Sequence, residues 1–174
     1  MSDRLRRLAA ERPGVQLSDL HRQFAYDRLL CRVFSGDPDR WVLKGAVAML
    51  ARLEGVSRHS LDVDLLYSSA DDLREAEDTL RSAAARDMGD QFRFTIGPGR
   101  LIAQVGRTLR VPVVAFVGAS EFASFRVDLV AGLTMTGVPE QVPPIVPIDL
   151  PGLLRTPYRA YPVVDHIADK VCGR

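Results

Sequence analysis

Two aspartates, Asp62 and Asp64, stand at alternate positions at the start of an apolar run, and this spacing constrains the fold more than any other feature. In a strand, side chains at positions i and i+2 point to the same face. The apolar residues around the pair, Leu61, Val63 and Leu65, then face the other side. Two neighbouring carboxylates repel each other unless a cation lies between them. A hard ion such as Mg²⁺, which prefers carboxylate and phosphate oxygens, fits this position. The pair therefore predicts a metal-dependent phosphoryl or nucleotidyl transfer site.

The residues before this pair predict a strand, a glycine turn and a short helix. The strand begins at Trp41, and Gly45 opens a helix that runs through Leu53. A glycine at a helix start can present backbone N–H groups to an anion, although many such turns contain glycine for steric reasons alone. Lys44 and Ser60 are candidate contacts for the outer phosphates of a nucleotide. The alternatives are a solvated lysine and a turn-forming serine.

A third acid, Asp128, lies within an apolar strand predicted over residues 122–130. An unpaired buried charge is costly, so this carboxylate needs a partner. If its strand neighbours that of Asp62 and Asp64, three carboxylates converge. Two Mg²⁺ ions need such a set to activate a hydroxyl and to hold a leaving phosphate. The alternative is that Asp128 pairs with a nearby arginine, because structural ion pairs resemble such sites.

Apolar periodicity and turn residues predict the remaining elements. We expect helices over residues 4–12, 18–36, 71–86 and 163–172, and strands over residues 92–96, 101–105, 109–117 and 122–130. Ser18 and Ser69 are the expected caps of the second and third helices. Pro112 predicts an edge or a bulge in its strand. We expect a core over residues 1–136, followed by a proline-rich crossing segment and a C-terminal helix over residues 137–174.

Composition excludes several classes of protein. A chain of 174 residues suffices for one domain with its own core. The net charge of +1 provides no general basic field, and the basic residues are arginines except Lys44 and Lys170. Cys31 and Cys172 lack metal-ligand spacing, and we expect both to be reduced and buried, as in a cytosolic protein. Without an apolar run of about 18 residues or a start like that of a signal peptide, we expect a cytoplasmic protein and no membrane partner.

Three motifs carry a family resemblance: LKGA at residues 43–46, RHSLDVDL at residues 58–65 and HIADK at residues 166–170. Together with the later V-D-L strand, they resemble the DNA polymerase β-like nucleotidyltransferase superfamily. Within it they look like the AbiEii/MenT branch, the toxins of AbiE- or MenAT-type toxin–antitoxin pairs. The resemblance covers residues 27–174.

The resemblance implies an α+β fold, a nucleotidyltransferase-like mixed sheet flanked by helices with a helical C-terminal part. It implies transfer of nucleotides from an NTP with Mg²⁺ to RNA, the 3′ acceptor end of tRNA, which blocks translation. It also implies a cognate antitoxin as partner. A two-ion Mg²⁺ site is expected, with Mn²⁺ as an alternative ion.

The resemblance also assigns roles to individual residues. Asp62 and Asp64 are expected to hold metal, with Asp128 as the third metal-binding acid, and Lys170 is expected to contact the triphosphate. These four residues form the expected catalytic set.

The nucleotide-binding set is separate. Ser60 is expected to contact phosphate, and Lys44, Gly45 and Arg58 complete the expected nucleotide contacts.

The sequence departs from the family pattern at two places. Ala46 replaces the usual second glycine, which keeps room for close backbone approach. The branch normally continues past the lysine helix into another helix with a further functional aspartate, whereas this chain ends four residues after Lys170. The expectation is that the C-terminal part is incomplete or that this member lacks that acid.

Two other functions remain open at this point. A metal-dependent glycosyltransferase also uses D-x-D with Mn²⁺ and a nucleotide sugar, but it leaves Ser60, Lys44 and Lys170 without a role. The other alternative is an inactive nucleotidyltransferase-fold module that binds a nucleotide or a partner without turnover.

Overall fold

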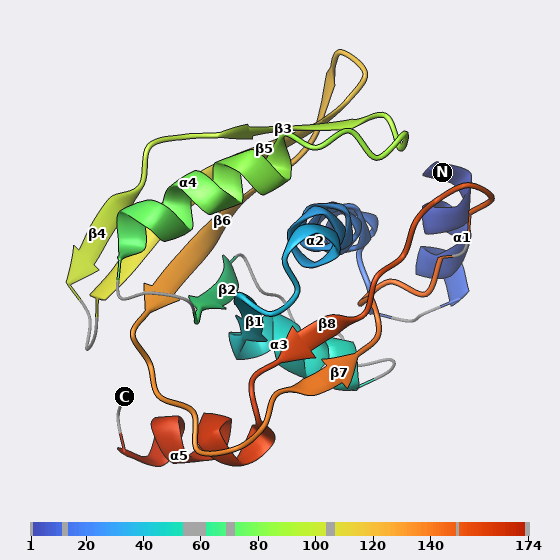
Figure 1. Ribbon diagram of the computed structural model, residues 1–174. Helices are drawn as coiled ribbons and strands as arrows, with labels where there is room; N and C mark the ends of the chain where they lie inside the picture. Colours follow the sequence, from blue (N-terminus) through green and yellow to red (C-terminus); the bar gives the residue numbers. More distant parts are fainter. Residues whose placement is uncertain are drawn as a thin grey trace.

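The computed structural model describes residues 2–11, 14–53, 62–68, 72–103, 107–148 and 150–172. Within these ranges the strands form one mixed sheet in the order β3-β5-β6-β2-β1-β8-β7, with β4 paired to β5 beside β3 (Figure 1). The pairs β2–β6 and β1–β8 are parallel, and the others are antiparallel. The predicted α+β class, with a mixed sheet flanked by helices, is confirmed.

The strands are β1 (Trp41–Lys44), β2 (Asp62–Tyr67), β3 (Phe92–Ile96), β4 (Arg100–Ala103), β5 (Arg107–Val117), β6 (Ser120–Ala131), β7 (Glu140–Val142) and β8 (Tyr158–Ala160). The helices are α1 (Ser2–Glu11), α2 (Leu17–Gly36), α3 (Gly45–Arg52), α4 (Leu73–Ala84) and α5 (Val163–Cys172). No helix in these ranges is both long and apolar enough to cross a membrane.

The main core lies between one face of the sheet and the helices α2 and α4, which contact each other (Figure 1). Strand alternation sends Val63 and Leu65 of β2, and Val127 and Leu129 of β6, into this core. The residues between them face the opposite side of the sheet, which we call the outer face. The outer face therefore receives every acid of the predicted site that lies in a strand.

Two predicted helix starts are wrong. Helix α2 begins at Leu17, because the backbone carbonyl of Gln16 already accepts from Asp19 and Leu20, so Ser18 lies inside the helix. Helix α4 begins at Leu73 and is capped by Asp72, whose carboxylate accepts from the backbone N–H of Arg74 at 2.8 Å. The expected cap of α4, Ser69, lies outside the described residues.

The expectation for Pro112 is also wrong, because β5 lies inside the sheet and its bulge falls at Ala115/Phe116. Pro112 lies between the last pair with β3 and the first pair with β4. Its carbonyl accepts from the N–H of Gly97 at 2.8 Å. The missing N–H of Pro112 faces this gap, so the sheet loses no ladder hydrogen bond there.

The C-terminal segment joins the same sheet. Strand β7 pairs with β8, and β8 lies parallel to β1 with Ala160 opposite Leu43. The buried carboxylate of Asp27 on α2 holds this segment, because it accepts from the N–H groups of Ile145 and Val146 at 2.9 and 2.8 Å. The division at residues 136 and 137 stays a prediction.

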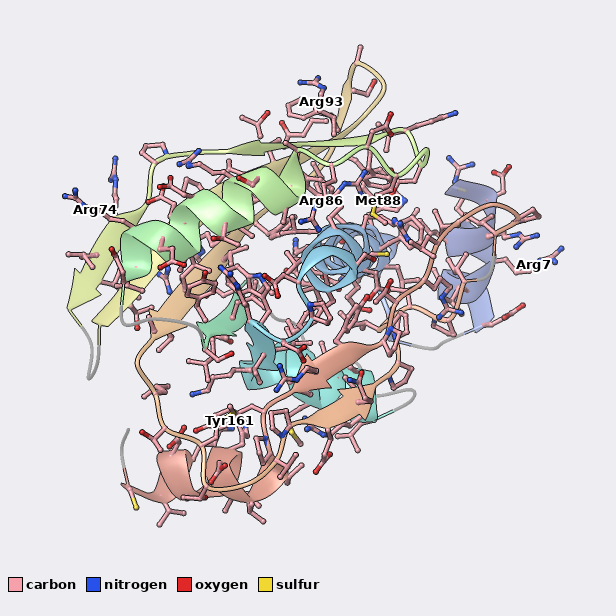
Figure 2. All side chains as sticks on the ribbon, viewed as in Figure 1. Arg7, Arg74, Arg86, Met88, Arg93 and Tyr161 are labelled. Carbon is pink, nitrogen blue, oxygen red and sulfur yellow. The ribbon has the colours of Figure 1, made fainter. Side chains whose placement is uncertain are left out.

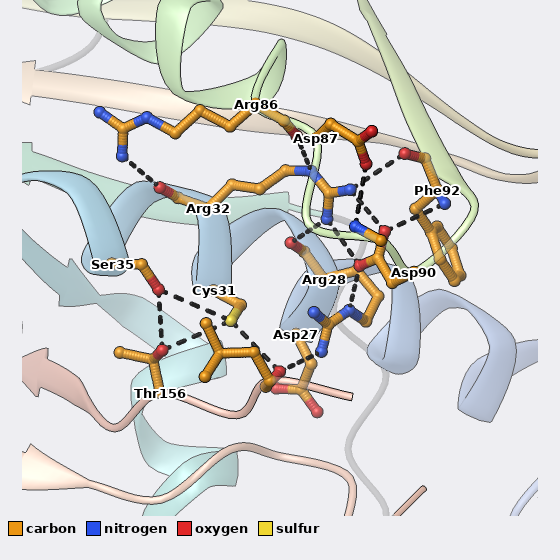
Figure 3. A network of polar contacts seen from close by, with 12 residues as sticks. Asp27, Arg28, Cys31, Arg32, Ser35, Arg86, Asp87, Asp90, Phe92 and Thr156 are labelled. Carbon is orange, nitrogen blue, oxygen red and sulfur yellow. Dashed lines mark hydrogen bonds and ion pairs between the residues drawn. The ribbon is translucent and has the colours of Figure 1, made fainter. Parts of the chain in front are cut away.

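A second buried polar network ties α2 to the turn before β3 (Figure 3). Asp90 accepts from Arg32 at 2.6 Å and from Arg28 at 2.8 Å, and the three side chains are almost fully buried. Cys31 beside them is buried, as expected, whereas the prediction for Cys172 is wrong because it is exposed on α5. Both cysteines are free thiols.

Candidate active site

The parallel pairing of β2 with β6 brings the predicted acids together. Asp64 lies directly opposite Asp128, and Asp62 lies opposite Arg126. On the other side of β6, the antiparallel strand β5 places Arg110 opposite Asp128. All five side chains belong to alternate positions on the outer face. The predicted neighbourhood of the two acidic strands is therefore present.

Two arginines occupy the oxygens of two of these acids. Arg110 binds Asp128 with both ends of its guanidinium, at 2.8 Å from Nε to Oδ1 and 2.7 Å from Nη2 to Oδ2. Its Nη2 also lies 3.7 Å from Oδ2 of Asp62. Arg126 donates from Nε to Oδ1 of Asp62 at 2.6 Å. The arginine partner that the sequence left open for Asp128 is thus present, beside the other acids.

Asp64 differs from the other two acids, because no hydrogen bond or ion pair joins it to an arginine in the described part of the chain. A Cβ placed on Gly45 would lie 1.9 Å from its Oδ2, so the carboxylate rests directly on the backbone where α3 begins. Burial, and after it the negative charges of Asp128 and Asp62, raise the pKa of Asp64 to about 6. Lys44, opposite Asp64 on β1, acts in the other direction.

Lys44 connects this cluster to the C-terminal helix. Its ammonium Nζ lies 3.3 Å from Oδ2 of Asp169 on α5 and 4.0 Å from the ring centroid of Tyr161. Figure 2 shows Tyr161 next to α5. Helix α5 is held a second time by Asp165, whose carboxylate accepts from the N–H groups of Thr136 and Gly137. The position of Lys44 therefore depends on how α5 docks.

The other predicted nucleotide contacts are placed less closely. Lys170 is exposed on α5, where its charge, after burial, helps to lower the pKa of His166. Within the described ranges it makes no ion pair. Ser60 and Arg58 lie outside the described residues. The structure therefore brings together Asp62, Asp64 and Asp128, with Lys44 and Gly45 beside them.

Sequence reasoning missed three charged residues around the acids: Arg110, Arg126 and Asp169. Strand alternation predicts that Arg126 shares a face with Asp128, two positions later, but this spacing alone gave Arg126 no role. Asp169 lies directly before Lys170 in the HIADK motif, and no local pattern indicates its contact with Lys44. Arg110 carried no local signal, because its contact depends on strand register.

The acids fit a divalent cation by their chemistry. Carboxylate oxygens are the ligands that Mg²⁺ prefers. The pKa of Asp64 is raised in part by the negative charges of Asp128 and Asp62, and a bound cation would neutralise these charges. As the side chains stand, no group of three potential ligands in the described residues is arranged around a metal position. The reason is visible in the ion pairs, since Asp62 and Asp128 turn their oxygens toward arginines. Asp62, Asp64 and Asp128 would hold the ion once at least one of those pairs opens.

The chain matches a known protein family. The family model described as "Nucleotidyl transferase AbiEii toxin, Type IV TA system" matches residues 28–173. A comparison with curated proteins found no match. The matched range includes Asp62, Asp64 and Asp128 and both lysines.

Proposed function

The chain belongs to the AbiEii family of nucleotidyl transferase toxins from toxin–antitoxin systems, and from this premise we propose that it is a Mg²⁺-dependent enzyme that transfers nucleotides from an NTP to RNA. The proposed acceptor is the 3′ end of tRNA, whose modification blocks translation. Membership in the family implies a cognate antitoxin as partner. Because NTPs and tRNA are cytoplasmic substrates, the proposed location of the protein is the cytoplasm.

One observation carries the proposal: the parallel register that sets Asp64 opposite Asp128, with Asp62 on the same face. Three carboxylates on adjacent strands match what nucleotidyl transfer requires of a protein. Mg²⁺ held by such a set polarises the phosphoryl oxygen and favours the ionised form of the attacking hydroxyl.

The chain's own residues have separate tasks in this proposal. Asp64, held against the Gly45 backbone, provides oxygens next to the start of α3, and Asp62 and Asp128 provide those of the adjacent positions. Lys44 lies next to Asp64 and balances part of its charge. The backbone N–H groups at the start of α3 are placed to receive phosphate oxygens.

The roles proposed for the remaining nucleotide contacts are based on the family resemblance. Ser60 and Arg58 are assigned to the nucleotide's phosphates. Lys170 is assigned to the triphosphate, where an ammonium neutralises charge that develops in the transition state.

The proposal is tested by incubating the protein with each α-³²P-labelled NTP in turn, total tRNA and Mg²⁺. We expect one or more NTPs to label tRNA with the parent protein and none with Asp62→Asn or Asp64→Asn. Glu121→Gln is the matched control, because this exposed carboxylate lies at the far end of β6. Absence of label with every NTP would contradict the enzymatic proposal and favour a binding module.

A further inference from the structure

In the acid cluster, formed by Asp62, Asp64 and Asp128, two carboxylates already bind arginine side chains of the protein itself. Arg110 and Arg126 hold the oxygens of Asp128 and Asp62 that a metal ion would need. A guanidinium and a divalent cation cannot use the same carboxylate oxygen in the same direction. Metal binding at these acids therefore requires at least one ion pair to open.

The two arginines differ in how firmly they are held. Arg110 makes two hydrogen bonds to one carboxylate, and the Asp128 side chain is only 9% exposed. A bidentate pair is strong and geometrically specific. Arg126 donates to Asp62 from Nε, and both partners are more open, with 41% of the Arg126 side chain and 29% of the Asp62 side chain exposed. Exposed pairs of this kind contribute little to stability, because solvent screens them. Arg126 is the partner that opens at least cost.

Open space lies next to Arg126 on the side away from the acids. A shallow depression of about 330 Å³ is lined by Pro112, Val114, Ser124 and Arg126, with Val113 and Phe125 between them. The first four residues lie on the outer face, in register across β5 and β6. The guanidinium of Arg126 thus stands between the acid cluster and a surface that a substrate can reach.

We propose that Arg126 is an exchangeable cation of this site. It neutralises Asp62 in the metal-free protein, leaves Asp62 when a divalent cation binds, and then binds phosphate oxygens that arrive over the depression. Arg110 stays on Asp128 and positions it. This inference rests on the proposed function, because it assumes that the acids bind a divalent cation.

Phosphate is the ligand that the chemistry of the released group selects. A guanidinium carries planar, paired N–H donors that match phosphate oxygens and stays charged at every physiological pH. Two sources of phosphate reach such a site, the triphosphate of the nucleotide and the backbone of the acceptor RNA. Both have the same oxygen chemistry, and the test separates them.

The test compares the parent with Arg126→Gln and Arg126→Lys. Titration calorimetry measures binding of Mg²⁺ alone, of inorganic tripolyphosphate with Mg²⁺, and of a single-stranded RNA oligonucleotide. Arg93→Gln is the matched control, because it removes an exposed arginine of β3 whose guanidinium stacks on Phe116. In Figure 2 Arg93 lies at the opposite side of the molecule from Tyr161. Mg²⁺ binding is measured at about 0.15 M and about 1 M KCl, because salt screens distant charges but not direct contacts.

The expected result has opposite signs for the two ligands. Arg126→Gln should bind Mg²⁺ about fivefold more tightly at both salt concentrations, because the ion no longer has to break one exposed ion pair. It should bind a phosphate ligand about tenfold more weakly, because the ligand loses one charged hydrogen-bond partner. A role limited to folding would move both affinities in the same direction. Arg126→Lys should keep part of both properties, since its charge remains.

The phosphate arms identify the source. Weaker binding of tripolyphosphate assigns Arg126 to the nucleotide, and weaker binding of the oligonucleotide alone assigns it to the acceptor. Unchanged binding of both overturns the inference. Equal Mg²⁺ affinity in the parent and Arg126→Gln also overturns it, while leaving the proposed function intact. Absence of Mg²⁺ binding in both proteins overturns the inference and the metal part of the proposed function together.

Discussion

The carboxylate of Asp64 rests on Gly45 so closely that a Cβ on this glycine would lie 1.9 Å from Oδ2. Gly45 also has a φ of +64°, in the left-handed region that side chains disfavour. One residue therefore serves two purposes, because it turns the chain from β1 into α3 and leaves room for an acid of the neighbouring strand. The KG motif and the D-x-D motif of the sequence meet at this contact.

Gly45→Ala should disrupt both purposes. We expect it to abolish nucleotide transfer, because the new Cβ must displace Asp64, and to lower the free energy of unfolding by about 2 kcal/mol or more. Gly118→Ala is the matched control, since Gly118 has a φ of +60° with nothing within 4 Å of its Cβ position. It should cost about 1 kcal/mol from backbone strain alone. Denaturant unfolding and the labelling assay measure the two effects, and equal losses in both variants would argue against the Asp64 contact.

The acids should differ in their effect on stability although all are needed for transfer. Asp64→Asn should leave the metal-free protein as stable or slightly more stable, because it removes repulsion from Asp62 and Asp128. Asp128→Asn should lower the free energy of unfolding by about 2 kcal/mol, because Arg110 loses a bidentate charged partner. Thermal unfolding in EDTA buffer checks both. A large destabilisation by Asp64→Asn would show that this carboxylate has a structural role.

Lys170→Ala should affect activity without affecting stability. The side chain is exposed on α5, so the melting temperature should stay nearly unchanged. If its ammonium binds the triphosphate, transfer should slow by at least about tenfold, which corresponds to about 1.4 kcal/mol of transition-state stabilisation. Lys170→Arg should restore activity only partly, because a planar fork does not reproduce a compact charge. Steady-state kinetics decide this, and parental rates in Lys170→Ala would return the lysine to the surface.

Asp27 should make stability depend on pH. Burial raises its pKa from 3.8 to about 6 in the folded protein, against the opposing effect of its hydrogen bonds from Tyr158, Val146 and Ile145. Between these two pKa values the folded state keeps a proton that the unfolded state has lost. This group's contribution to stability is therefore largest below pH 4 and falls as the pH rises to about 6. The slope is about 1.4 kcal/mol per pH unit.

Comparison with Asp27→Asn isolates this contribution from those of other acids. The variant should be less stable overall, because its amide places an N–H₂ group against backbone donors. Its unfolding free energy, measured in denaturant from pH 4 to pH 7, should lack the decline that the parent shows relative to it. Parallel pH profiles for the two proteins would contradict the raised pKa.

The sequence by itself determined the parts of this site that depend on local geometry. Asp62 and Asp64 share a face because strand side chains alternate with a period of two. The same rule places Asp128 on the face opposite to that of Val127 and Leu129. The sequence also predicted Gly45 as the turn between a strand and a helix. The strand at residues 92–96 and the helix at residues 163–172 also agree with their predicted bounds. These features need only a few consecutive residues.

Only the tertiary structure decided which charges meet. The pair Val117↔Ser120 starts the β5–β6 hairpin, and an unshifted register would place Leu109 opposite Asp128. The bulge at Ala115/Phe116 shifts the pairing by one residue and places Arg110 there instead. A one-residue shift reverses which side chains reach a face. The parallel pairing of β2 with β6, and the docking of Asp169 against Lys44, likewise join segments far apart in the chain. Such contacts depend on how all the elements pack together, which local sequence patterns do not encode.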